Sequence, residues 1–188
     1  MSEEQTLAEA RIDEAIRRIA RFHKECDYQR LVDIPLIPPP ASEQEIETLE
    51  VQLGCSLPAE YRMVLNRCKY LFIFEGYRIW GIDGPGQRPG IERWEGRDCL
   101  VFGDYWRDAD GDNLVLDLDS PPKSSILVWH HDEASYEFLA PSLSVALCKI
   151  VDELFPEEHF EEAVRRTIEE IRFAEKPWWK RLFGGASK

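Results

Sequence analysis

The sequence predicts an α+β fold, with a mixed, mostly antiparallel sheet of about five to six strands flanked by helices and with extra N- and C-terminal helices. Three observations support this class. Apolar residues recur at helical spacing near both ends of the chain, short β-branched and aromatic runs fill the middle, and turn-forming residues separate those runs. Helices followed by strands and then by helices are typical of α+β proteins, whereas regular strand–helix alternation would indicate a parallel sheet.

The N-terminal part combines a helix with a segment that cannot continue it. Ile12, Ala15, Ile19 and Phe22 recur at helical spacing and predict an amphipathic helix. Residues 34–40 (IPLIPPP) exclude a helix, because proline lacks an amide hydrogen and clashes with the preceding turn. Residues 1–36 are therefore expected to form a helical extension with a proline-rich linker, and the linker is the expected domain boundary.

Two short helices are expected next. Ser42 caps the first, and Glu45 completes a capping box with it. Gly54 ends this helix, because glycine readily adopts the left-handed conformation found at helix C-termini. Pro58 suits the first turn of the second helix. The residues expected to be buried in these two helices are Ile46, Leu49, Leu53, Tyr61, Val64 and Leu65.

The middle of the chain is predicted to form the sheet. Glu75 and Gly76 separate the first two apolar runs and predict a hairpin. Residues 83–97 hold closely spaced glycines and prolines and are expected to form a long loop. The predicted strands are residues 70–74, 77–82, 99–102, 114–118, 126–129 and 136–139.

Helices return after the sheet. Ser142 or Ser144 is expected to cap a helix that runs to Leu154, and a last helix follows Pro156. The apolar stripe of this last helix is Phe160, Val164, Ile168 and Ile171. Residues 156–188 are therefore expected to form a C-terminal helix and a basic, aromatic tail.

Charge is the strongest signal in the composition. Thirty-six acidic residues against 23 lysines and arginines give a net charge of −13. Such a charge repels nucleic acids and anionic membranes and attracts a basic partner, although the same acidity also serves solubility alone. Neither a nucleic-acid partner nor stable membrane association is expected.

Cysteine usage and hydropathy predict a cytoplasmic location. The five cysteines are scattered without a CxxC pair, so neither a disulfide framework nor a zinc site is expected. The N-terminal residues lack the apolar run of a signal peptide, and no run approaches the 18 apolar residues of a membrane span.

Several short motifs follow one another in a characteristic order. PASEQEIETLE (40–50) and LGCSLPAEYR (53–62) hold a Pro-x-Ser cap, an Ile-x-x-Leu-Glu helix and a Leu-Pro-x-x-Tyr-Arg helix. LVFGD (100–104), DGDNLVLDL (110–118) and VWHHD (128–132) follow. In these motifs the chain resembles the SUKH superfamily. The resemblance implies one α+β domain over residues 37–155. It also implies a protein-binding module without shared catalytic residues, in a group of bacterial toxin-immunity proteins and fungal cell-wall regulators.

An acidic cluster lies between residues 104 and 119, with six aspartates and one arginine. An EF-hand with Asp108 first would need glycine at loop position six and glutamate at twelve, and neither is present, so no metal is expected. Asp110 and Gly111 instead predict a hairpin turn, which would display its acids to a partner. Tyr105 and Trp106 either anchor that partner or pack on the sheet. Trp94 either contacts the partner from a loop or folds back onto the core.

Two histidines invite a catalytic or metal-binding interpretation. His130 and His131 precede Asp132 and Glu133. Adjacent strand residues point to opposite faces, so the two imidazoles are not expected to converge on one ion. No nucleophile or zinc-protease motif accompanies them. The chain is therefore expected to be no enzyme and to need no cofactor.

The C-terminal tail is the one basic segment. Lys176, Lys180, Arg181 and Lys188 give it a charge of +4, and Trp178 and Trp179 make it resemble an interfacial membrane anchor. The rest of the chain then carries −13 − 4 = −17, which opposes approach to an anionic surface. The tail is expected either to dock on the protein's own acidic surface or to be disordered.

These observations lead to one functional hypothesis and two alternatives. The chain is expected to be a bacterial immunity protein that neutralises a cognate, basic, nuclease-type toxin domain by direct binding, and the immunity role rests on the resemblance. A regulatory or scaffold module for an endogenous protein is the first alternative, and a metal-dependent enzyme using His130 and His131 is the second. The predicted contact residues are Trp94, Tyr105, Trp106, Asp108, Asp110 and Asp112.

Overall fold

The α+β class is confirmed by a computed structural model, which describes residues 2–31, 34–74, 76–84, 87–94, 96–105, 111–119 and 125–174. Its helices are α1 (Glu3–Glu25), α2 (Glu43–Leu53), α3 (Ala59–Leu65), α4 (Leu143–Leu154) and α5 (Phe160–Ala174), with 3-10 turns η1 (Tyr28–Leu31) and η2 (Glu157–His159). Its strands are β1 (Leu71–Phe74), β2 (Tyr77–Ile79), β3 (Gly90–Trp94), β4 (Arg97–Tyr105), β5 (Asn113–Asp117), β6 (Ile126–His130) and β7 (Ser135–Ala140).

The strands form one sheet in which every described pair is antiparallel. The order is β1-β2-β4-β5-β6-β7, and β3 pairs with β4 beside β2. The predicted long loop over residues 83–97 is wrong in its second half, which forms β3. The cluster of glycines and prolines ends before Gly90, and Gly96, with φ of 84°, provides the tight turn into β4.

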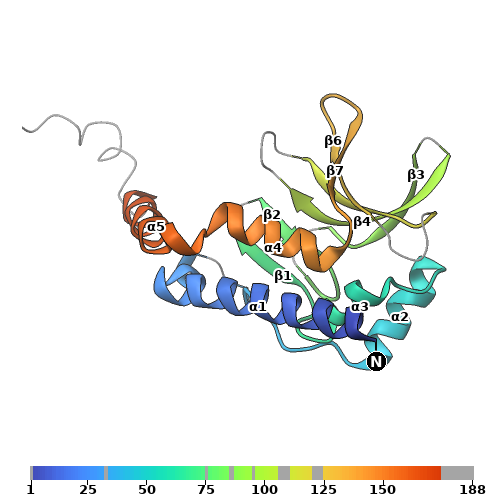
Figure 1. Ribbon diagram of the computed structural model, residues 1–188, viewed down its shortest axis with the longest axis horizontal. Helices are drawn as coiled ribbons and strands as arrows, with labels where there is room; N and C mark the ends of the chain where they lie inside the picture. The colour runs from blue at the N-terminus through green and yellow to red at the C-terminus, as the bar shows by residue number, and fades with distance from the viewer. Residues whose placement is uncertain are drawn as a thin grey trace, which may run out of the picture.

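The helices cover one side of this sheet. Figure 1 shows α1, α2 and α3 on the side away from the β3 and β6–β7 hairpins, with α5 beyond one end of α1. Residues of α1, α3 and α4 share one hydrophobic core with the inner face of the sheet, including Ile12, Tyr61, Leu100, Leu114 and Leu147. None of the helices in the described part of the chain is long and apolar enough to cross a membrane.

Helix ends follow the sequence closely. Ser42 accepts from the amide of Glu45, whose carboxylate accepts from Ser42, so the predicted capping box is present. Gly54 adopts the left-handed conformation with φ of 71° and ends α2. Ser142 occupies the N-cap position of α4 without a side-chain capping bond, and the Ser144 amide donates instead to the Glu60 carboxylate at 2.7 Å.

The proline-rich segment packs against the sheet. The Phe72 amide donates to the Leu36 carbonyl at 3.1 Å, and the Lys69 amide donates to the Pro39 carbonyl at 3.1 Å. The Tyr70 hydroxyl donates to the Pro35 carbonyl at 2.9 Å. The segment therefore covers the β1 edge of the sheet, and α1 before it lies in the same core as the strands.

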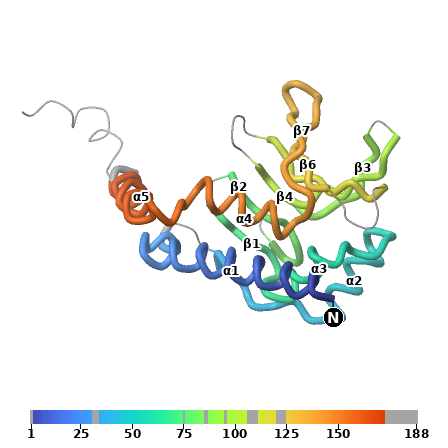
Figure 2. Tube along the Cα trace, viewed as in Figure 1, coloured from blue at the N-terminus to red at the C-terminus, as the bar shows by residue number. Residues whose placement is uncertain are grey.

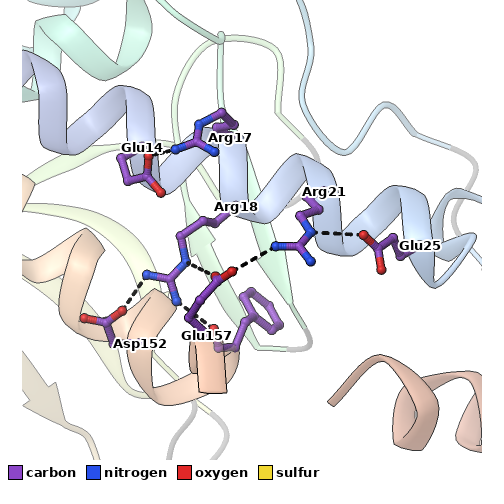
Figure 3. A network of polar contacts seen from close by, with 8 residues as sticks. Glu14, Arg17, Arg18, Arg21, Glu25, Asp152 and Glu157 are labelled. Carbon is purple, nitrogen blue, oxygen red and sulfur yellow. Dashed lines mark hydrogen bonds and ion pairs between the residues drawn. The ribbon is translucent and has the colours of Figure 1, made fainter. Parts of the chain in front are cut away.

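An ion-pair network joins α1 to the end of α4 and to η2. Figure 3 shows Arg18 and Arg21 of α1 reaching toward Asp152 and Glu157, which lie in α4 and η2. Arg18 donates to Asp152 at 2.5 Å and to the carbonyl of Phe155 at 2.6 Å. Arg21 contacts Glu157 at 3.1 Å. Because the Arg18 side chain is only 14% exposed, its bonds are poorly screened by water.

Replacing Arg18 with alanine is expected to lower the free energy of unfolding by about 1.5–3 kcal/mol, the range for hydrogen bonds to charged groups. Arg17→Ala is the matched control, because Arg17 lies in the same helix, is 71% exposed and pairs only with Glu14 of its own helix among the described contacts. Its loss is expected to cost less than about 0.5 kcal/mol. Urea denaturation of both variants checks this, and equal midpoints would contradict it.

Candidate protein-binding surface

The sheet face opposite the helices carries a cluster of aromatic side chains. Trp94 of β3 stacks on Trp129 of β6, with ring centroids 5.0 Å apart and an interplanar angle of 22°. Tyr136 of β7 lies 4.9 Å from Trp129 and 5.7 Å from Trp94. Phe138 of β7 shares this face, because it is paired with Leu127, and it is 58% exposed. These four residues, Trp94, Trp129, Tyr136 and Phe138, are called the aromatic surface below.

Strong curvature of the sheet brings the aromatic surface together. Three strand spacings separate β3 from β6, which is roughly 14 Å in a flat sheet. The 5.0 Å stacking of Trp94 on Trp129 therefore requires the sheet to curl toward its outer face. Register shifts occur between Val101 and Gly103 of β4 and between Ile126 and Leu127 of β6, and such bulges increase twist and bend strands. Figure 2 shows the β3 and β6–β7 hairpins rising on the side away from α1.

A small second core lies under these rings. Cys99, Val101 and Val115 are at most 4% exposed, and they are not part of the main core between sheet and helices. Burial raises the pKa of the Cys99 thiol, so this side chain stays uncharged at neutral pH and acts as an apolar group. The rings are thus supported from below, which limits the side-chain entropy that a partner's binding would cost.

Exposed acids lie on the strands that carry the aromatic surface and on their turn. On β3, β4, β7 and the turn between β6 and β7, five acidic residues are exposed: Glu92, Asp98, Asp132, Glu133 and Glu137. Arg93 and Arg97 are the exposed basic residues on the same described elements. The surface therefore combines apolar rings with a net negative rim.

Asp112 organises the neighbouring end of the sheet. It is 1% exposed, and its carboxylate contacts His130 Nδ1 at 2.8 Å and His131 Nδ1 at 3.1 Å, while it accepts from the His131 amide at 3.1 Å. Both imidazoles contact this carboxylate because His131 lies past the end of β6, in the turn, where the strand alternation of side chains no longer applies. Nε2 of His130 contacts Glu137 of β7 at 3.3 Å. His130 of β6 therefore links β7 with Asp112, the residue before β5.

The contacts of this cluster shift two pKa values. Burial acts to raise the pKa of Asp112, but hydrogen bonds from His130 and His131 outweigh it and hold that pKa below its usual value. Burial acts to lower the pKa of His130, but hydrogen bonds to Asp112 and Glu137 outweigh it and raise that pKa above 6.5. The His130 contribution to stability is complete below the unfolded pKa and is lost as pH rises through the folded pKa, whereas the Asp112 contribution is lost only as pH falls through its lowered pKa.

His130→Gln is therefore expected to cost more stability at about pH 5.5 than at about pH 8.5. At the lower pH the wild-type imidazolium lies between two carboxylates, and at the higher pH its charge is lost. Urea midpoints of both proteins at the two pH values provide the measurement. A difference between the proteins that does not change with pH would contradict the His130 assignment.

The six predicted contact residues do not lie together in the structure. Trp94 lies in the aromatic surface, on a strand. Trp106, Asp108 and Asp110 lie outside the described residues. Tyr105 and Asp112 were expected to contact a partner, but their side chains are buried, at 2% and 1% exposed, and are not available on the surface. The bulge in β4 turns Tyr105 toward the helices, where its hydroxyl contacts Glu153 of α4 at 3.3 Å, and Asp112 is occupied by the two histidines.

Three residues of the aromatic surface were not among the predicted contacts, namely Trp129, Tyr136 and Phe138. A weak signal for them exists, because Leu127 and Trp129, and likewise Tyr136 and Phe138, are large apolar residues two positions apart on predicted strands. That alternation indicates an apolar outer face in addition to the apolar inner face.

Within the described ranges no group of three or more histidine, cysteine, aspartate or glutamate side chains could hold a metal ion. His130 and His131 contact carboxylates, and the acids of residues 104–119 include Asp104, Asp112 and Asp117, each at most 7% exposed. Asp104 accepts from the Trp80 indole at 3.0 Å, and Asp117 contacts Arg97 at 3.5 Å. These aspartates serve the fold, so fewer acids face solvent than the sequence indicates.

Comparison with known proteins identifies one family for this chain. A search of curated proteins finds no match for this chain. The family model described as SMI1 / KNR4 family (SUKH-1) matches residues 40–149, which run from the segment before α2 into α4 and include every strand. The chain belongs to the SMI1 / KNR4 family (SUKH-1).

Proposed function

We propose that the chain is a bacterial immunity protein that neutralises a cognate toxin by binding it directly through the aromatic surface. Membership of the SMI1 / KNR4 family supports an immunity or regulatory domain that acts by protein–protein interaction. The toxin partner goes beyond that general role and is the part that needs a test.

The aromatic surface is the single observation that carries the proposal. Tryptophan and tyrosine are enriched among the residues that dominate binding energy at protein interfaces. Trp94, Trp129 and Tyr136 are half-buried and Phe138 is 58% exposed, and a contiguous exposed apolar patch on a protein often marks an interaction site. The cluster lies on the sheet face away from the helices, so a folded partner can reach it.

The acidic rim supports a basic partner. Five exposed acids against two exposed arginines lie on β3, β4, β7 and the β6–β7 turn, in a chain with a net charge of −13. Complementary charge raises association rates and selects among partners more than it adds affinity. A basic, nuclease-type toxin fits this surface, and binding would block its substrate groove sterically and compete with the phosphates it binds. The proposed contacts are Trp94, Trp129, Tyr136 and Phe138, together with Trp106, Asp108 and Asp110 as sequence-based predictions.

Co-expression with the product of the neighbouring gene tests the proposal. The expected result is a stable complex on co-purification and growth of cells that the product alone would kill. Growth without a complex, or a complex without rescue, would contradict direct neutralisation. A complex with a housekeeping protein, and no toxic neighbour, would instead favour the regulatory alternative.

A further inference from the structure

The two ends of the sheet differ in how their edges are covered. At one end, residues 36 and 39 accept hydrogen bonds from Phe72 and Lys69, so the chain itself covers β1. At the other end, β7 pairs with β6 alone among the described strands. Lys149 of α4 donates to the Leu139 carbonyl at 3.5 Å, and within the described residues β6 is the one strand that pairs with residues 135–138.

The side chains of this edge include exposed apolar groups. Natural proteins commonly protect such edges with charge, bulges or a covering segment, because exposed apolar edge strands pair with other chains. Here Phe138 is 58% exposed beside the half-buried Tyr136, and both belong to the aromatic surface. Ser135 and Glu137 alternate with them and point to the other side of the strand.

Charge selects among the strands that could pair there. Residues 125–142 contain Asp132, Glu133 and Glu137 and neither lysine nor arginine. A second copy of β7 would bring like charges together, which disfavours pairing between two copies of this chain. The β3 edge, by contrast, carries Arg93 beside Glu92, so these two charges cancel. A basic strand therefore fits β7 better than β3 or a second copy does.

We propose that the partner contributes an extended segment of alternating apolar and basic residues, which pairs with β7 over residues 135–138 and extends the sheet. Its apolar side chains pack on Phe138 and Tyr136, and its basic side chains reach Glu137 and the acids of the β6–β7 turn. This inference rests on the proposed function, because it states how the partner reaches the aromatic surface.

A synthetic peptide of four Val-Lys repeats with capped ends is the probe. Titration of the full-length protein is expected to show saturable binding, with the largest backbone amide NMR shifts at residues 135–138. A control peptide with every backbone nitrogen methylated cannot donate to β7, and is expected to bind at least about tenfold more weakly. A peptide of Val-Glu repeats is expected to show no binding, because of the acidic rim.

Two matched variants locate the site. Phe138→Ser is expected to weaken binding of the Val-Lys peptide about tenfold, the effect of losing one well-placed apolar contact. Val51→Ser, at an 81% exposed position of α2, is expected to leave it unchanged. Both substitutions lie on the surface, so thermal unfolding should change little.

Lack of saturable binding, or shifts centred away from β7, would overturn the inference. The proposed function would be unaffected, because the co-expression and rescue experiment tests it separately. Equal affinity of the parent and methylated peptides, with shifts confined to the side chains of Trp94, Trp129 and Tyr136, would overturn strand pairing. The same result would support binding by the aromatic surface, so the two hypotheses fail separately.

Discussion

Replacing Phe22 with alanine is expected to lower the free energy of unfolding by about 3–5 kcal/mol, the largest loss of stability that we predict. Phe22 of α1 is 1% exposed, and its ring stacks on Phe155 with centroids 3.9 Å apart. It also meets the edges of Phe74 in β1 and Phe160 in α5. These aromatics come from four separate parts of the chain. Alanine would leave a cavity between them, and each would lose van der Waals contacts.

Leu7→Ala is the matched control, because Leu7 belongs to the same helix and is 49% exposed. Its truncation is expected to change stability by no more than about 0.5 kcal/mol. Urea denaturation followed by circular dichroism measures both variants. Similar small losses for Phe22→Ala and Leu7→Ala would show that α1 is a peripheral extension and would contradict its place in the core.

Trp129→Ala is expected to weaken binding of the cognate partner by at least about 2 kcal/mol, which is roughly a 30-fold rise in the dissociation constant. Trp129 lies at the centre of the aromatic surface, in contact with both Trp94 and Tyr136. Its removal takes away an indole ring and also the support of its two neighbours, so the effect should exceed that of any single rim charge.

Calorimetric titration with the co-purified partner measures this effect. Val51→Ala on α2 is the control, since Val51 is 81% exposed on a different part of the surface and should bind as the unchanged protein does. Circular dichroism and thermal unfolding confirm that the Trp129 variant is folded. Unchanged affinity in a folded Trp129→Ala protein would exclude the aromatic surface as the main contact.

Local chemistry explains why much of the fold was predictable. The Ser42 capping box, the Gly54 stop and the apolar stripe of α1 depend on residues within a few positions of one another. Six of the seven strands in the described part of the chain coincide with β-branched or aromatic runs. β3 was missed because its sequence, GIERW, lacks such a run, and the strand exists through its register with β4.

The site was less predictable because its geometry is not local. Trp94 and Trp129 meet only because bulges curl the sheet, and a bulge cannot be placed from alternation alone. The bulge between Val101 and Gly103 also shifts the side-chain alternation, which places Tyr105 on the inner face. The sequence indicates a surface acid at Asp112, whereas the structure places His130 and His131, from a different strand and its turn, against its carboxylate.

Hydrogen–deuterium exchange of the chain, alone and in complex with its co-purified partner, tests the central claim most directly. If the aromatic surface binds the partner, protection should appear in β3, β6 and β7, and exchange in α1 and α5 should stay the same. Protection confined to α1 and α5, with β3, β6 and β7 exchanging as in the free protein, would contradict the account.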